Sequence, residues 1–154
     1  MVPIKVRPGD LRNFLEHEYP GLRKDSEWAI TSNQTTRYNC FAWAAHDELN
    51  NWEPEGDYWP EGCLRELTIP AFIEAYGSLG FSSVTTRRSP KRVERIAIFT
   101  VNGVPQHAAR QLSSGLWTSK LGHGFDISHK LKSICCDDYG EVAVILERDR
   151  VRAD

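Results

Sequence analysis

Cys40 and His107 are the residues of this sequence best placed to act as a nucleophile and as a general base. Cys40 comes at the start of an apolar run, residues 41–49, with the alanine content and spacing of a buried helix. The N–H groups and dipole of a helix N-terminus favour the thiolate, the reactive form of cysteine. His107 follows a Pro-Gln dipeptide at the start of an expected strand, far enough along the chain for that strand to fold back onto the helix. The pair predicts a thiol nucleophile with an imidazole base.

The remaining cysteines favour neither cross-links nor a metal. Cys135 and Cys136 are adjacent, which is poor geometry for a disulfide between them, and Cys63 has no regular spacing to the rest. The sequence holds no Cys/His pair at the spacing of a zinc site. We therefore expect free thiols in a reducing compartment, with no metal and no cofactor. A metal site built from Cys40, His107 and a later residue is the least favoured alternative.

The elements that would position these residues are predicted by caps, turns and periodicity. Asp10 and Thr68 are suited to begin helices, and Pro20-Gly21 ends the first of them. The expected helices are residues 10–19, 41–49 and 68–76. The expected strands are residues 81–86, 95–101, 107–112, 116–121 and 141–146, with a helical turn at residues 126–131. Because the helices come first and the strands follow, we expect an α+β fold.

Residues 107–121 are expected to form a hairpin. If its turn centres on Ser114, His107 faces Leu121 across the two strands. Ser119 then lies two residues back on the same face of the sheet, within diagonal reach of His107. A polar side chain is therefore expected beside the imidazole.

The composition is that of a single soluble domain. The chain has 154 residues, 40% hydrophobic and 26% charged, enough for one domain over residues 1–154 with its own core. Its net charge of −2 provides no basic field for nucleic acid. No apolar run approaches the roughly 20 residues of a membrane span, and the first residues lack the apolar core of a secretion signal. We expect a cytoplasmic protein, or one exported without a conventional signal peptide, that binds neither nucleic acid nor membrane.

The segment around Cys40 resembles a known superfamily. A small apolar helix that opens Tyr-Asn-Cys-Phe-Ala-Trp-Ala, followed by strands of which the first carries His107, is similar to the papain-like thiol hydrolases. In size and order it is most similar to their compact bacterial branch, the NlpC-like peptidases and amidases. That branch typically opens the helix with Asp-Cys-Ser-Gly, where this sequence has Asn-Cys-Phe-Ala. Residues 38–45 and 107–121 also resemble a family of small, uncharacterised bacterial proteins, which implies no activity.

The papain-like resemblance implies a fold and a set of roles. N-terminal helices would pack on a small antiparallel sheet. Cys40 would attack a carbonyl carbon, and His107 would take the thiol proton and later give it to the leaving group. A third residue, Asp126 or Ser119, would orient the imidazole. Gln34, six residues before the nucleophile, would donate to the oxyanion beside the Cys40 N–H.

Tryptophan is abundant, with five in the chain. Trp52 and Trp59 stand in an acidic loop punctuated by Pro and Gly that would flank the site. Together with Trp43 and Trp117 they are candidates for substrate contact, and the loop would favour a cationic or amide-rich partner. Packing in the core and in loops is the alternative role for each of these side chains.

We therefore expect a cysteine-nucleophile enzyme that hydrolyses an amide or isopeptide bond in a peptide, a protein or a small amide. Transglutamination and glutamine deamidation would use the same residues with a different acceptor. The alternative is a non-catalytic papain-like binding module, in which Cys40 is buried and unreactive. The sequence leaves the oligomeric state open.

Overall fold

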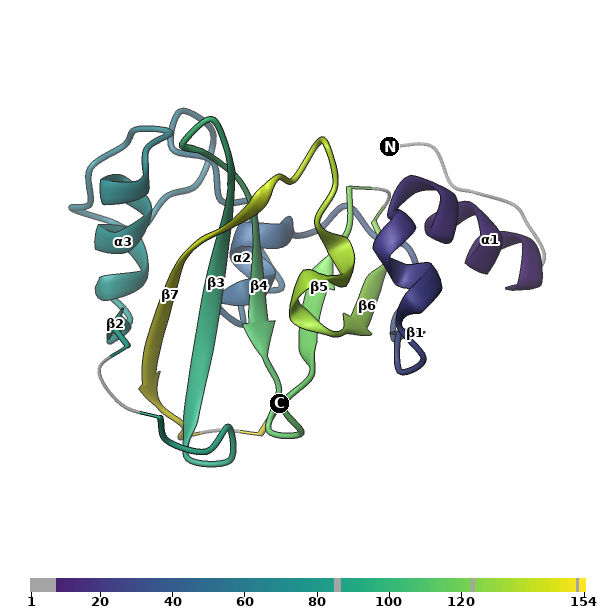
Figure 1. Cartoon of the computed structure of the whole chain (residues 1–154). Coiled ribbons are helices and arrows are strands. Elements are labelled where there is room, and N and C mark those ends of the chain that lie inside the picture. Colours follow the sequence, from purple (N-terminus) through teal and green to yellow (C-terminus); the bar gives the residue numbers. More distant parts are fainter. Residues whose placement is uncertain (1–7, 85–86, 123, 152) are drawn as a thin grey trace.

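The computed structural model describes residues 8–84, 87–122, 124–151 and 153–154, and its centre is a single antiparallel sheet (Figure 1). Seven strands lie in the order β1-β6-β5-β4-β3-β7-β2, and every pairing between neighbours is antiparallel. The strands are β1 (Ala29–Ile30), β2 (Ser82–Ser83), β3 (Val93–Val101), β4 (Val104–Gln111), β5 (Trp117–Lys120), β6 (Asp126–His129) and β7 (Glu141–Asp149). The fold is α+β, as the sequence predicts.

The helices are short, and local signals explain where they begin. They are α1 (Pro8–Glu18), η1 (Pro20–Lys24), α2 (Cys40–Ala44), α3 (Ile69–Gly77) and η2 (Leu131–Ile134), where η marks a 3₁₀ helix. The Thr68 side chain caps α3 by accepting the Ala71 N–H, and Pro70 stands in the first turn, where its missing N–H costs no hydrogen bond. Among the described residues, no helix has the length and apolar character needed to cross a membrane.

Helices cover both faces of the sheet, and each face has its own hydrophobic core. On one face, which we call the α2 face, α2 and α3 pack on β3, β4 and β7 through Ala42, Phe72 and Ile98. On the other, the α1 face, α1, η1 and η2 pack on the sheet through Leu15, Leu22 and Ile134. Figure 1 shows α2 behind the central strands and α1 at the end of the sheet that carries β6 and β1.

The register of the central hairpin agrees with the sequence prediction, but its length does not. Arg110 pairs with Thr118 and Gln111 with Trp117, as a turn centred on Ser114 requires. The ladder between β4 and β5 consists of these two pairs, so the expected pairing of His107 with Leu121 is not formed. Strands β4 and β5 are therefore not paired beside His107. The cavity described below is lined by residues of both strands in this region.

Three other segments differ from expectation. Residues 126–131 were expected to form a helical turn, but residues 126–129 are strand β6, in which Ile127 faces a core. The helix expected over residues 41–49 ends at Ala44, because His46 adopts a left-handed backbone with φ of 62°. The strand expected over residues 81–86 is reduced to the two residues of β2, and residues 85–86 lie outside the described part of the chain.

Candidate active site

The start of α2 is fixed by the side chain of Asn39. Its Oδ1 accepts hydrogen bonds from the N–H groups of Ala42 at 3.1 Å and Trp52 at 3.0 Å, and its Nδ2 donates to the Trp52 carbonyl at 2.8 Å. One side chain therefore caps the helix and ties the acidic loop to it. Cys40 is the first residue of α2, directly after Asn39, so these hydrogen bonds fix its position.

Cys40 lines a cavity of about 270 Å³. The cavity lies where α2 begins, where β4 begins and where β5 ends, and its walls are mostly apolar. Its polar or ionisable side chains include Gln106, Lys120 and Tyr139. Polar side chains from several segments of the chain converge on this cavity, which is a feature of ligand sites.

The Cys40 thiol is neutral at pH 7. Burial raises its pKa to about 12, although the backbone N–H groups of Ala108, Phe41 and Cys40 itself act in the opposite direction. α2 packs against β4, and Ala108 belongs to the core on the α2 face. The side chain of the preceding residue, His107, lies on the opposite, α1 face, against Phe99 and Tyr139, and does not line the Cys40 cavity.

His107 belongs to a chain of buried polar groups on the α1 face. Its Nε2 lies 2.9 Å from Ser119 Oγ, and the same oxygen lies 2.7 Å from His129 Nε2. The chain ends at the Lys130 carbonyl, 2.7 Å from His129 Nδ1. Burial lowers the pKa of His107 well below its usual value and that of His129 to about 4, so both rings are neutral at pH 7.

Tyr139 forms a wall shared by His107 and the Cys40 cavity. Its ring stacks on His107 with centroids 4.1 Å apart and planes at 8°, and it also lines the cavity. Its hydroxyl accepts the Gly122 N–H at 3.0 Å and lies 3.0 Å from the Tyr19 hydroxyl. Within the described part of the chain, no hydrogen bond reaches His107 Nδ1, and none therefore joins it to the Cys40 thiol.

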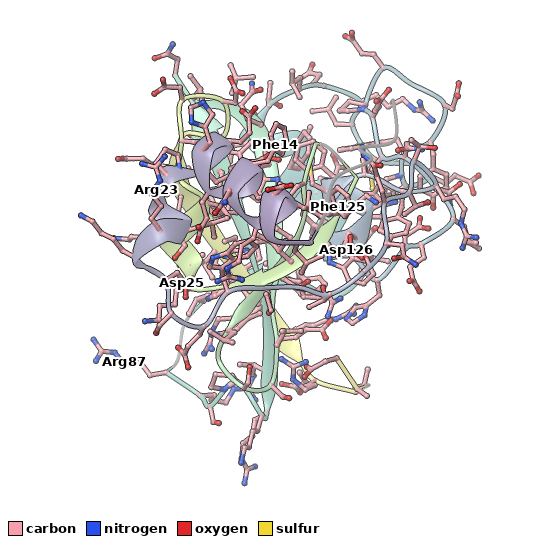
Figure 2. All side chains as sticks on the ribbon, turned by 90° about the vertical axis from the view of Figure 1, so that its right-hand side faces the viewer. Phe14, Arg23, Asp25, Arg87, Phe125 and Asp126 are labelled. Atoms are coloured by element: carbon pink, nitrogen blue, oxygen red, sulfur yellow. The ribbon has the colours of Figure 1, made fainter. Side chains whose placement is uncertain are left out.

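Of the two residues expected to orient the imidazole, Ser119 contacts it and Asp126 contacts Tyr38. Asp126 Oδ2 accepts the Tyr38 hydroxyl at 2.7 Å on the α2 face, and burial raises the pKa of the carboxyl. Lys120 lies over the Tyr38 ring and donates to two backbone carbonyls at the cavity wall. Figure 2 views the α1 end of the molecule, where Asp126 follows Phe125 at the start of β6. The Asp126 carboxylate thus anchors Tyr38, the residue before Asn39.

The expected oxyanion donor and the tryptophans do not line the Cys40 cavity. Gln34 is half-buried in the loop before α2, whereas Gln106, which the sequence did not single out, reaches the cavity. The Trp52, Trp59 and Trp117 rings are buried in the two cores. Trp43 donates from Nε1 to Thr118 at 3.0 Å under the Arg110 guanidinium. These four indoles make packing contacts in the structure, and Trp52 also lines a separate pocket beside the acidic loop.

Several residues of the site left no usable signal in the sequence. Tyr139 precedes a glycine and resembled an ordinary turn residue, and His129 lay in a segment expected to be helical. Their role depends on the sheet order, which places β6 two strands away from β4. Among the described residues, no group of three His, Cys, Asp or Glu side chains could hold a metal ion.

Comparison with known proteins identifies a family but no activity. Residues 29–147, more than half of the chain, match the model of a family described as a domain of unknown function (DUF7689). The matched segment includes Cys40, His107, Ser119, His129 and Tyr139. No curated protein and no solved structure matches the chain.

Proposed function

The chain belongs to the DUF7689 domain family, and from its own geometry we propose that it is a papain-like cysteine enzyme that hydrolyses an amide or isopeptide bond. The Cys40 sulfur attacks the carbonyl carbon, and His107 accepts the thiol proton at Nδ1 while Ser119 holds Nε2. The proton then passes to the leaving amine, and water cleaves the thioester. The substrate is a peptide, a protein or a small amide.

The observation that carries the proposal is the unpartnered Nδ1 of His107. His107 is fully buried, and leaving a buried polar atom without a hydrogen bond costs about 1–3 kcal/mol. The Ala108 N–H lowers the pKa of the Cys40 thiol, against the effect of burial, and Tyr139 contacts both the imidazole and the cavity. In the proposed mechanism, Nδ1 of His107 is left free to accept the thiol proton.

The surroundings of Cys40 also favour acyl transfer. The exposed Gln106 side chain reaches the Cys40 cavity from β4. In the proposed reaction its amide N–H stabilises the negative charge that develops on the carbonyl oxygen during attack. The cavity of about 270 Å³ admits a small acyl group and leaves the leaving group outside.

One observation favours the alternative, a binding module without catalysis. Burial raises the pKa of Cys40 to about 12, so the free protein holds a thiol rather than a thiolate. An enzyme must then remove the proton as the sulfur attacks, whereas a binding module leaves the thiol inert. The reactivity of Cys40 toward an acyl donor separates the two functions.

The test is acylation by p-nitrophenyl acetate at pH 7.5, measured by nitrophenolate release and by peptide mass spectrometry. We expect Cys40 to be acetylated first and the thioester to be hydrolysed. His107→Asn should slow acetylation on the order of 10²-fold, the scale of lost general-base catalysis. Cys63→Ser, a change at a half-buried cysteine outside the cavity, should leave the rate unchanged. Acetylation spread evenly over the four cysteines, or unaffected by His107→Asn, would establish the binding module instead.

A further inference from the structure

Two buried histidines, His107 and His129, share the hydroxyl of Ser119. The proton positions in this series of hydrogen bonds can be worked out by starting at the Lys130 carbonyl. The Lys130 carbonyl can only accept a hydrogen bond, so His129 Nδ1, 2.7 Å away, must carry a proton. The main chain is also held on the other side of the Lys130 Cα, where the Lys130 N–H donates to Asp25 Oδ2 at 2.8 Å. The direction of this hydrogen bond is therefore fixed: His129 Nδ1 donates and the Lys130 carbonyl accepts.

The next step follows from the neutrality of His129. The ring is fully buried and uncharged at pH 7, so it carries one proton, and that proton is on Nδ1. Nε2 then presents a lone pair to Ser119 Oγ at 2.7 Å. Ser119 has a single hydroxyl proton, and it must donate that proton to His129.

The last step assigns the proton of His107. Because the Ser119 hydrogen points at His129, Ser119 Oγ can only accept from His107 Nε2, at 2.9 Å. His107 therefore carries its proton on Nε2, and Nδ1 keeps a lone pair. We infer that His129 is a positioning residue, which acts through Ser119 to hold His107 in the tautomer whose Nδ1 accepts a proton.

A serine by itself could not do this. A hydroxyl is both donor and acceptor, so Ser119 alone would bind either tautomer of His107. A carboxylate or an amide oxygen in that place would accept from Nε2–H and select one tautomer directly. Here His129 takes the hydroxyl proton and so gives Ser119 the character of an acceptor. Its role in catalysis rests on the proposed function, whereas the tautomer can be tested without any activity.

The experiment is ¹⁵N NMR of the full chain labelled at histidine, at pH 7, with His107 assigned from the spectrum of His107→Asn. Protonated and unprotonated ring nitrogens have well-separated ¹⁵N shifts, so the tautomer is observed directly. In the wild-type protein we expect His107 to be protonated on Nε2 and His129 on Nδ1. His107 protonated on Nδ1 would overturn the inference, whatever the enzyme does.

Two substitutions and a control test the role of His129. His129→Leu removes the acceptor and should leave His107 as a mixture of both tautomers, with acetylation of Cys40 slowed. His129→Gln offers an amide oxygen to Ser119 and should restore both the tautomer and most of the rate. His17→Gln changes an exposed histidine on α1 and should alter neither.

The outcomes separate the two proposals. If His129→Leu leaves the His107 proton on Nε2, His129 does not set the tautomer. If the tautomers are as expected but wild-type Cys40 is not acetylated, the proposed function fails and the positioning role within the fold remains. If His129→Leu does not fold, the wild-type spectrum and His129→Gln still decide the question.

Discussion

The acid-base groups of the site are neutral when no substrate is bound. Burial raises the pKa of Cys40 to about 12 and lowers that of His107 well below 6.5, so no thiolate–imidazolium pair forms in advance. In the proposed reaction, proton transfer must then accompany the attack of sulfur on the substrate. Such a site protects its thiol from general oxidants and alkylating agents, because these react with the thiolate.

The same buried histidines make stability depend on pH. The pKa of His129 falls from 6.5 in the unfolded chain to about 4 in the fold, so the unfolded state binds more protons between these values. Stability is fully present above pH 6.5 and is lost as the pH falls toward 4. Lowering the pH from 7 to 5 should cost about 2 kcal/mol through His129, and His107 adds to this loss.

Urea unfolding at the two pH values measures this effect. In His129→Gln the fall in the free energy of unfolding between pH 7 and pH 5 should be smaller than in the wild-type protein. His17→Gln, at an exposed position, should behave like the wild type. An equal fall in all three proteins would show that His129 is protonated without cost in the fold.

Among the elements, α2 is the shortest α-helix and is constrained at both ends. Asn39 caps its start, and the left-handed backbone of His46 turns the chain away just after its end. A helix of five residues is far below the length that is stable by itself, so packing and capping must hold it. The position of Cys40 depends on these contacts.

Removing the Asn39 side chain should therefore destabilise the protein. Asn39→Ala loses the cap and both hydrogen bonds to Trp52, and we expect a loss of about 2 kcal/mol in the free energy of unfolding. Asn39→Asp keeps the acceptor oxygen and should lose less. Urea denaturation provides the measurement, and equal stability of Asn39→Ala and the wild type would contradict the anchoring role.

Gly140 places Tyr139 against His107. Its φ is 74°, and a Cβ at this position would collide with the Thr100 carbonyl. Gly140→Ala should cost well over 2 kcal/mol, because it adds a backbone clash to the strain of a positive φ. Gly62→Ala is the matched control, since Gly62 has a φ of 78° and open space around it. Similar losses in the two variants, measured by urea denaturation, would contradict the close approach of Gly140 to β3.

The sequence predicted elements better than contacts. The Thr68 cap located α3, and the turn at Ser114 predicted the register of β4 and β5. The first helix was predicted from Asp10 as its cap, but α1 begins at Pro8 and contains Asp10 in its first turn. The sequence did not predict where the ladder between β4 and β5 ends, because the turn fixes the register of a hairpin but not the length of its pairing. The strand character of β6 was missed since a short polar run beside glycines shows little periodicity. The site residues His129 and Tyr139 come together only through the order of the strands.

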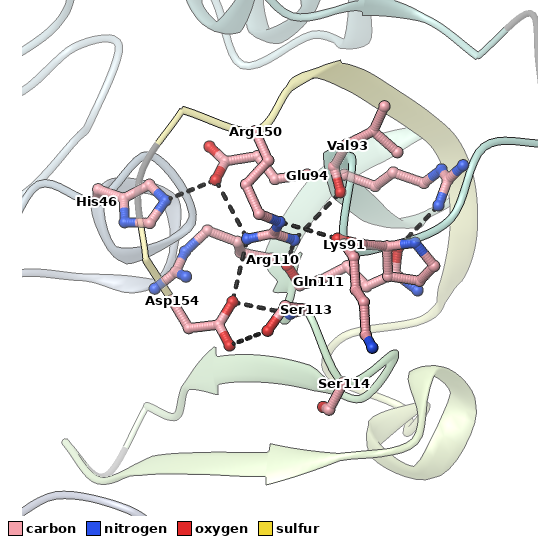
Figure 3. Close-up of polar contacts among 12 residues, drawn as sticks. His46, Lys91, Val93, Glu94, Arg110, Gln111, Ser113, Ser114, Arg150 and Asp154 are labelled. Atoms are coloured by element: carbon pink, nitrogen blue, oxygen red, sulfur yellow. Dashed lines mark hydrogen bonds and ion pairs between the residues drawn. The ribbon is translucent and has the colours of Figure 1, made fainter.

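At the scale of the whole molecule, a buried carboxylate joins segments that are far apart in the sequence. Glu94 on β3 is fully buried, and its oxygens lie 2.6 Å from Arg148, 3.0 Å from His46 and 3.6 Å from Arg150. Burial would raise the pKa of Glu94, but His46 and Arg148 lower it to about 2. Figure 3 shows Arg150 between Glu94 and Asp154. This cluster connects the loop after α2, the central strand and the end of β7.

Neutralising Glu94 should destabilise the whole domain. Glu94→Gln leaves buried cations without their counter-charge, and we expect a loss of about 3 kcal/mol in the free energy of unfolding. The control is Asp149→Asn, which breaks an exposed ion pair with Arg88 and should cost less than about 1 kcal/mol. Urea denaturation of both variants at pH 7 checks this. Equal effects would contradict the central role of the buried cluster.

The place of β7 has a consequence for synthesis. β7 inserts between β3 and β2, yet it is the final strand of the sheet to leave the ribosome. A nascent chain that ends before β7 has an open edge on its longest hairpin and lacks the arginines that neutralise Glu94. The sheet therefore cannot be completed, nor Glu94 neutralised, until the segment that carries β7 and these arginines has emerged.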